Sequence, residues 1–174
     1  MIERVNAEET TYILSNAVLS ANEGIQNHGT ISGEKVIQMM TGLIEKGAYY
    51  LVYKENDSIA GWILVGTNTD YFTEKEIGFI YDVYVLSEFR GKGISKKLVQ
   101  AGIEELKRNG YEEVRLNVFS TNFAQEIHEK IGFTPLQTVM VYKKIRTENK
   151  EKYPESVLFF VFSFEVLLER ITWL

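Results

Sequence analysis

The sequence contains no cysteine and only 2 prolines among its 174 residues. Without cysteine there is no disulfide, no zinc–thiolate or iron–sulfur centre and no cysteine nucleophile, and a reducing compartment such as the cytoplasm is the expected location. With 45% hydrophobic and 25% charged residues, the composition excludes disordered, collagen-like and low-complexity classes. The length fits one domain, so we expect a single domain over residues 1–174.

Long apolar runs are missing as well. The longest, residues 157–162 with an extension to Leu168, is well short of the ~20 residues that a membrane-spanning helix needs. The first residues show no basic stretch followed by an apolar one, so no export signal is expected. Lys and Arg number 19 against 24 Asp and Glu, and the net charge of -5 argues against a dedicated nucleic-acid binder. We therefore expect neither a membrane nor a nucleic acid as partner.

Hydrophobic periodicity, caps and turn formers predict the order of the elements. The predicted elements are a strand at 2–5, a helix from Asn6 with Glu9 as capping-box partner, a loop at 22–30, a helix after Ser32, strands at 48–53, 58–65 and 77–86, a helix at 94–106, a strand at 114–118, a helix at 123–131 and strands at 136–145 and 156–168. For residues 156–168 a terminal helix is the alternative. This order predicts an α+β fold with a mixed sheet.

A basic loop stands out in this acidic chain. Its four cations are Arg90, Lys92, Lys96 and Lys97, and two glycines but no acid lie among them. Glycine permits close backbone approach, and the unpaired N–H groups and dipole of the helix start favour an anion. The loop therefore predicts a phosphate or pyrophosphate site; the alternative is a glycine turn before a helix with a solvated basic face. A Walker A loop is absent, and a dinucleotide fingerprint would need a third glycine in place of Lys96.

The segment Arg90-Gly91-Lys92-Gly93-Ile94-Ser95 resembles the Arg/Gln-x-x-Gly-x-Gly/Ala loop of the GNAT superfamily of acetyl-CoA-dependent N-acyltransferases, with Ser95 as the one departure. The likeness covers about residues 77–133, where Asn122 to Phe133 resemble the family's Asn-x-x-Ala-x-x-Leu-Tyr-x-x-x-Gly-Phe helix. It implies an α/β/α sandwich with a mixed, mostly antiparallel central sheet of six to seven strands and about four helices. It further implies splayed fourth and fifth strands and a C-terminal strand pair at about 134–168.

The same resemblance implies acetyl-CoA as co-substrate and assigns its contacts. The backbone of Val83 and Val85 is expected to bind the pantetheine arm. Asn122 is expected to hydrogen-bond the same arm, and a helix cap is its alternative role. Arg90 is expected to shape the loop. The N–H groups expected to hold the pyrophosphate are those of Gly91, Lys92, Gly93, Ile94 and Ser95, with the side chains of Lys92 and Lys96 near the phosphates.

The activity implied is transfer of an acetyl group to a primary amine by direct attack on the thioester in a ternary complex, without a metal or a covalent enzyme intermediate. The N–H of Val85 is the expected oxyanion donor. The family's usual thiolate acid is a tyrosine, and this chain has His128 there. The alternative is that water protonates the thiolate and that His128 lies on a partly exposed helix face.

The general base is less clearly indicated. Related ribosomal-protein-type enzymes carry a glutamate where this chain has Asn117, and an amide is no base. Tyr81 and Asp82 are substitutes whose side chains are expected on opposite faces of the strand, with Tyr81 favoured and Asp82 a structural partner. Deprotonation through water is the alternative. Because the usual tyrosine and glutamate are missing, the alternative function is a catalytically weak acyl-CoA-binding regulatory module.

The acceptor is expected to be a small-molecule or peptide amine. Acceptor specificity in the family lies in regions corresponding to residues 22–47 and 142–155, where no motif identifies the amine; Tyr142 is expected to line the cleft or to pack in the core. The C-terminal strand indicates a homodimer by pairing or exchange, and a strand packed within its own sheet is the alternative.

Overall fold

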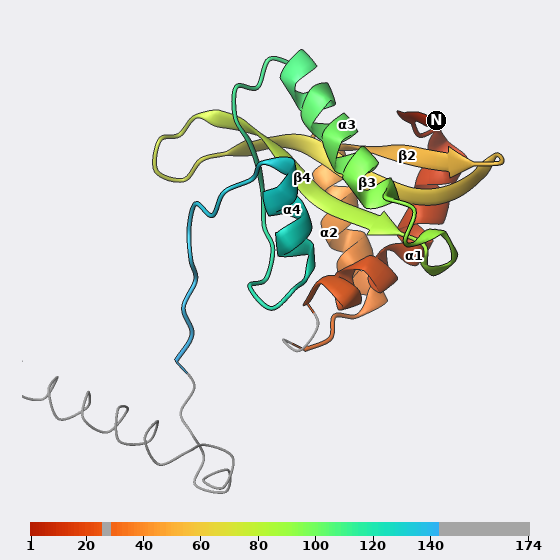
Figure 1. Ribbon diagram of the computed structural model, residues 1–174, viewed down its shortest axis with the longest axis horizontal. Helices are drawn as coiled ribbons and strands as arrows, with labels where there is room; N and C mark the ends of the chain where they lie inside the picture. The colour runs from red at the N-terminus through yellow and green to blue at the C-terminus, as the bar shows by residue number, and fades with distance from the viewer. Residues whose placement is uncertain (26–28, 143–174) are drawn as a thin grey trace, which may run out of the picture. The chain divides into compact units, whose positions relative to one another are not determined.

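The computed structural model describes residues 1–25 and 29–142 (Figure 1). Its elements, in chain order, are β1 (Ile2–Arg4), α1 (Ala7–Ile25), α2 (Gly33–Glu45), β2 (Tyr49–Glu55), β3 (Ser58–Thr69), β4 (Glu76–Val85), the 3₁₀ helix η2 (Ser87–Phe89), α3 (Ile94–Arg108), β5 (Val114–Leu116) and α4 (Ala124–Ile131). All of them lie in one compact unit, Met1–Thr134, and the chain from Pro135 onward belongs to a second unit.

The five strands form one sheet in the order β1-β2-β3-β4-β5, antiparallel except for the parallel pair β4–β5. Alternate residues of β3 enter two different cores, as a period of two requires. Trp62 and Leu64 pack in the core that includes residues of α1 and α2. Ile63 and Val65 pack in the core that includes residues of α3. The sheet is therefore covered on both faces, which confirms the predicted α/β/α sandwich.

The predicted helix starts are confirmed by their caps. Asn6 and Glu9 exchange hydrogen bonds between side chain and backbone N–H, each of 2.9 Å. The Ser32 hydroxyl accepts from the N–H of Lys35 at 3.3 Å. Each cap satisfies N–H groups that the first turn of a helix leaves unpaired.

The predicted loop at 22–30 begins too early, because α1 continues to Ile25. The polar residues of its last turn make tertiary contacts. The Asn22 side-chain oxygen accepts from the N–H of Ile31 at 3.0 Å, and Glu23 bonds to Tyr84 and Arg90. These residues are polar because they bond to distant partners. A local sequence pattern does not identify such partners and therefore predicts a loop.

The described residues contain five strands, fewer than the six to seven expected. The strand predicted at 136–145 is not seen in its described part, since residues 136–142 have no regular secondary structure. A single strand needs a hydrogen-bonding neighbour. Its predicted neighbour at 156–168 lies outside the described residues, as does the rest of the strand pair predicted at about 134–168.

A β-bulge interrupts β4. Leu64 pairs with Asp82 and Val65 pairs with Ile80, which leaves Tyr81 as the extra residue. Tyr81 packs against the core below α1 and α2, and Asp82 is bonded to Ser20 of α1. The expectation that these two side chains point to opposite faces is therefore wrong, because the bulge breaks the period of two.

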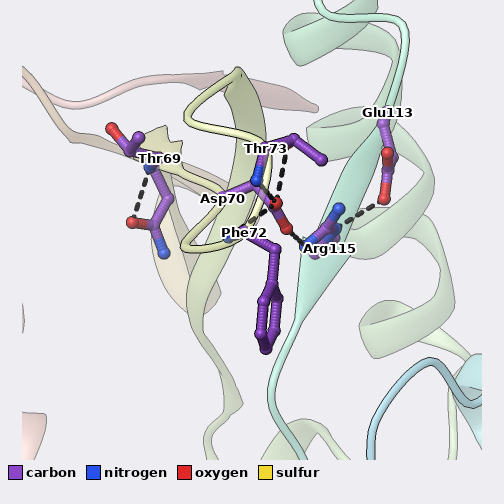
Figure 2. A network of polar contacts seen from close by, with 7 residues as sticks. Thr69, Asp70, Phe72, Thr73, Glu113 and Arg115 are labelled. Carbon is purple, nitrogen blue, oxygen red and sulfur yellow. Dashed lines mark hydrogen bonds and ion pairs between the residues drawn. The ribbon is translucent and has the colours of Figure 1, made fainter.

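A side-chain clasp holds the β3–β4 hairpin to β5 (Figure 2). One oxygen of Asp70 accepts from the N–H of Phe72 at 3.1 Å and from the N–H and hydroxyl of Thr73, each at 2.7 Å. The other oxygen pairs with Arg115, which also pairs with Glu113. The bonds from Thr73 and the guanidinium of Arg115 hold the pKa of Asp70 well below its usual range. The hairpin end is therefore fixed.

Candidate active site

The C-terminal half of β4 extends past its neighbour β5. The parallel pairing covers only Gly78–Ile80 of β4, so β4 and β5 part beyond that point, as predicted. The N–H of Leu86 donates to Ala60 of β3 at 3.0 Å. Because peptide groups alternate between the two edges of a strand, those of Val83 and Val85 point to the other edge, on the side of β5. Beyond Ile80 this edge has no strand partner among the described residues, and the Val85 carbonyl on it accepts from Arg90.

The loop after β4 ends in a left-handed turn at the start of α3. Gly91 and Gly93 have φ angles of 78° and 71°, and a Cβ atom at either would meet nothing within 4 Å. Glycine is needed here for its backbone conformation, since L side chains rarely adopt these angles. Gly93 is the N-cap residue and makes no side-chain cap. The first N–H groups of α3 are thus available for an anion.

Arg90 connects this loop to β4 and α1. Its Nε donates to the carbonyl of Val85 at 3.0 Å. Its Nη2 donates to both carboxylate oxygens of Glu23, at 3.0 and 2.9 Å. The guanidinium carbon also lies 5.3 Å from the centre of the Tyr84 ring. Arg90 therefore joins the loop to β4 and α1, and its bond to Glu23 raises the pKa of Arg90.

The lysines of the loop have different surroundings. Lys92 pairs with Glu55, at the β2–β3 turn, at 2.7 Å, and its ammonium lies 5.3 Å from the Phe89 ring centre. Lys97 lies 5.4 Å from the ring centre of Tyr53, whereas Lys96 is exposed. In this arrangement the Lys92 side chain points to the turn, and its predicted contact with a phosphate would require it to leave Glu55.

Asn122, two residues before α4, connects the start of α4 to α1. Its side-chain oxygen accepts from the N–H of Ala124 at 2.9 Å, and its Nδ2 donates to the carbonyl of Gly24 at 3.2 Å. The first bond supports the first residue of α4 from two positions before it, while the N-cap residue is Phe123, which makes no side-chain cap bond. The contact of Asn122 with a pantetheine arm stays a prediction.

His128 is buried in α4, with 5% of its surface exposed. Its Nδ1 has no hydrogen-bond partner among the described residues, and its ring stands edge-on to Phe133 at 5.9 Å. Burial lowers the pKa of His128 from its ordinary 6.5, so the neutral imidazole is favoured at pH 7. The alternative of a partly exposed histidine is wrong, because Ile131 and Phe133 of the same segment pack into the core beneath α3.

The two candidate bases of β4 are both engaged. The Tyr81 hydroxyl donates to the carbonyl of Thr67 at 2.6 Å, and burial, followed by the nearby Tyr111, raises its pKa. The Asp82 carboxylate accepts from the Ser20 hydroxyl and from Nε1 of Trp62, the latter at 2.9 Å. Burial raises the pKa of Asp82. These contacts fit the structural role predicted for Asp82.

Sequence reasoning missed the last turns of α1. Ser20 contacts β4, Glu23 contacts β4 and the glycine loop, and Gly24 contacts the segment just before α4. Their spacing of i, i+3 and i+4 puts them on one face of the helix. That spacing was readable, but nothing local indicates the partners, which lie 61 to 98 residues away.

In residues 1–25 and 29–142, no group of three His, Asp or Glu side chains could hold a metal ion. No helix in those residues is long and apolar enough to cross a membrane.

Comparison with known proteins identifies the class. The family model described as acetyltransferase (GNAT) family matches residues 23–133, more than half of the chain. The chain therefore belongs to the GNAT acetyltransferase family, as the motif resemblance indicated.

Curated relatives support this membership. Mycothiol acetyltransferase of Corynebacterium glutamicum (strain R) is 32% identical over 96 residues, which are 53% of this chain and 33% of that protein. The uncharacterised N-acetyltransferase YycN of Bacillus subtilis is 28% identical over 61% of this chain and 71% of its own. The ribosomal protein bS18 alanine N-acetyltransferase of Haemophilus influenzae is 32% identical over 51% and 58%. The chain spans only a third of the mycothiol enzyme.

Solved structures show the same fold. The aminoglycoside 6'-N-acetyltransferase AAC(6')-IG of Acinetobacter haemolyticus has a TM-score of 0.62 at 17% identity, covering 84% of this chain and 99% of its own. The aminoglycoside N-acetyltransferase AAC(6')-Iy in complex with CoA has a TM-score of 0.61 at 17% identity, covering 83% and 93%.

Proposed function

We propose that the protein is an acetyl-CoA-dependent N-acetyltransferase that moves an acetyl group to a primary amine by direct attack on the thioester. The observation that carries this is the left-handed glycine turn at Gly91 and Gly93, which opens the uncapped start of α3 beside the open edge of β4. The pyrophosphate binds the N–H groups of residues 91–95. The pantetheine arm extends along Val83 and Val85.

The transfer requires neutral amine, because the ammonium form has no free electron pair. The amine nitrogen attacks the thioester carbonyl carbon, a C–N bond forms, and the C–S bond breaks with its electron pair going to sulfur. The nitrogen loses a proton and the thiolate gains one. The N–H of Val85, at the open edge of β4, is the proposed donor to the oxyanion.

Solvent is the proposed route for the proton from the amine. The Tyr81 hydroxyl donates a hydrogen bond to the Thr67 carbonyl and has a raised pKa, so Tyr81 is protonated at neutral pH. Asn117, just past β5, is an amide. The proton for the thiolate comes from His128 or from water, and substitution of His128 by glutamine separates the two by its effect on kcat.

Thermal unfolding with acetyl-CoA tests the cofactor site. We expect millimolar acetyl-CoA to raise the Tm of the wild-type protein, since a ligand that binds only the folded state stabilises it. Gly93→Ala places a side chain at a φ of 71° and is expected to lose most of this shift. Gly33→Ala, at the start of α2 with nothing within 4 Å, is the matched control and should keep it. An unchanged Tm of the wild type would contradict the proposal.

Release of CoA thiol over a panel of amines tests the transfer. The panel contains polyamines, aminoglycosides, amino acids and peptides with free amino termini, because the names of similar proteins mention an aminoglycoside antibiotic and an alanine of a ribosomal protein. We expect CoA release with at least one amine. A cytoplasmic location and a homodimer belong to the same proposal and rest on the sequence alone.

A catalytically weak acyl-CoA-binding regulatory module is the second candidate. Three features favour it: burial makes His128 a poorer proton donor, Tyr81 keeps its proton at neutral pH, and the amide of Asn117 is no base. A Tm shift with acetyl-CoA but no CoA release with any amine would establish this reading.

A further inference from the structure

Glu23, on the last turn of α1, stands at the centre of three converging contacts. The hydroxyl of Tyr84 donates to its Oε1 at 3.0 Å, and Nη2 of Arg90 donates to both of its oxygens, at 3.0 and 2.9 Å. The Arg90 guanidinium in turn lies over the ring of Tyr84. The three side chains therefore form a closed set that joins α1, β4 and the glycine loop.

The peptide bond between Tyr84 and Val85 is the part of β4 that this set holds. Tyr84 is fixed directly, through its hydroxyl on Glu23. Val85 is fixed through Arg90, whose Nε donates to the Val85 carbonyl at 3.0 Å. Both residues that flank the N–H of Val85 are thus anchored to one carboxylate.

We propose that Glu23 is a positioning residue of the acetyl transfer, which acts through Arg90 and Tyr84 to orient the Val85 N–H toward the thioester carbonyl. This rests on the proposed function, in which that N–H meets the developing oxyanion. Electrostatic stabilisation depends on donors that are already oriented before the charge develops. A small displacement of such a donor lowers the rate without removing any group that touches substrate.

The geometry also separates the role of Arg90 from that of a phosphate ligand. Its Nε and Nη2 are committed to Val85 and Glu23, so its charge is balanced by a carboxylate within the protein. Arg90 therefore acts on the shape of β4 and the loop, and the backbone N–H groups hold the pyrophosphate. Lysine in its place lacks the fork that spans both acceptors.

The pair is about half exposed, 45% for the Arg90 side chain and 55% for that of Glu23. Exposed ion pairs contribute little to global stability. Loss of this ion pair should accordingly leave the Tm nearly unchanged. If the pair has no role beyond the ion pair itself, kcat also stays nearly unchanged, whereas a positioning role lowers kcat.

The test measures steady-state acetyl transfer to an amine that the wild type accepts. The variants are Glu23→Ala, Glu23→Gln, Arg90→Ala and the double variant Glu23→Ala with Arg90→Ala. We expect Glu23→Ala to lower kcat by roughly 10- to 100-fold, with the KM for acetyl-CoA changed by less than about threefold. Glu23→Gln keeps an acceptor oxygen and should recover part of kcat. The double variant should be no slower than the slower single one, because the two side chains act as a unit.

Glu55→Ala is the matched control. It removes an ion pair of 2.7 Å from the same loop, with Lys92, but its partner points to the β2–β3 turn. It should keep the wild-type kcat and show a Tm like that of Glu23→Ala. Two results would overturn the role of Glu23 and leave the proposed function intact. One is a Glu23→Ala variant as fast as Glu55→Ala, and the other is single effects on kcat that multiply in the double variant. A wild type that transfers acetyl to no amine would overturn the proposed function and this role together.

Discussion

At the scale of single residues, His128 is a titratable group in an apolar setting. Its Nδ1 is buried without a partner among the described residues, and burial lowers its pKa. Protonating it in the folded state is therefore harder than in the unfolded chain. This unequal protonation makes the stability of the protein depend on pH.

The dependence has a defined sign. Below pH 6.5 the unfolded chain binds a proton at this histidine that the folded protein does not yet bind, so the free energy of unfolding falls as the pH falls. The loss is at most about 1.4 kcal/mol per pH unit and ends below the folded pKa. Urea unfolding of the wild type and of His128→Gln between pH 7.5 and about pH 5 measures it. We expect the steeper decline in the wild type; equal slopes would contradict the prediction.

At the scale of elements, the hairpin of β3 and β4 depends on Asp70. Its side chain closes the turn and pairs with Arg115 of β5, while Tyr71 and Phe72 beside it are 89% and 79% exposed. Chymotrypsin cleaves after aromatic residues such as these two. In the folded protein, however, the contacts of Asp70 hold the backbone of the turn in place.

Asp70→Ala should release this turn. It removes the acceptor of three hydrogen bonds and the partner of Arg115, so we expect a lower Tm and faster chymotryptic cleavage after Tyr71 or Phe72. Asp70→Asn keeps an acceptor oxygen for Thr73, so its Tm and its cleavage rate should lie between those of the wild type and of Asp70→Ala. Because the folded pKa of Asp70 is depressed, its stabilisation is present above about pH 4 and is lost as the pH falls further.

Glu113→Ala provides the control for the clasp. Glu113 bonds to the same arginine from an exposed position and makes none of the turn contacts. Its loss should leave the cleavage rate at wild-type level. If Asp70→Ala resists chymotrypsin as well as Glu113→Ala does, the clasp does not fix the turn.

At the scale of the whole molecule, β5 is one of the two edge strands of the sheet within the described residues. An open edge invites further pairing, and the C-terminal strand predicted from sequence is the proposed neighbour, contributed by the same chain or by a second subunit. Light scattering of the full chain separates the two. We expect about twice the 20.0 kDa chain mass for exchange between subunits; a monomer at tens of micromolar would remove the dimer.

Sequence patterns predicted the elements well where local chemistry determines them. The reciprocal bonds of Asn6 and Glu9, the Ser32 cap and the glycines of the loop before α3 all depend on near neighbours in the chain. A run rich in β-branched and aromatic residues next to a turn likewise predicted the strand at 58–65, and β3 continues to Thr69.

The features that sequence reasoning missed depend on distant partners. The bulge at Tyr81 is defined only by its register against β3. Glu23 was assigned to a loop because its polar neighbours resemble one, and its partners Tyr84 and Arg90 lie in another part of the chain. The partly exposed position, given as the alternative for His128, was wrong because the packing of α4 against the core follows from the fold and not from the helix itself.

The contacts of the end of α1 have a consequence for the order of folding. The bonds from Ser20 to Asp82, from Arg90 to Glu23 and from Asn122 to Gly24 span 62, 67 and 98 residues. Closing such long loops costs chain entropy before any contact compensates for it, so local hairpins form sooner. The β2–β3 hairpin can therefore be complete while the site does not yet exist. We therefore expect acetyl-CoA binding to appear late in refolding, after the secondary structure has formed.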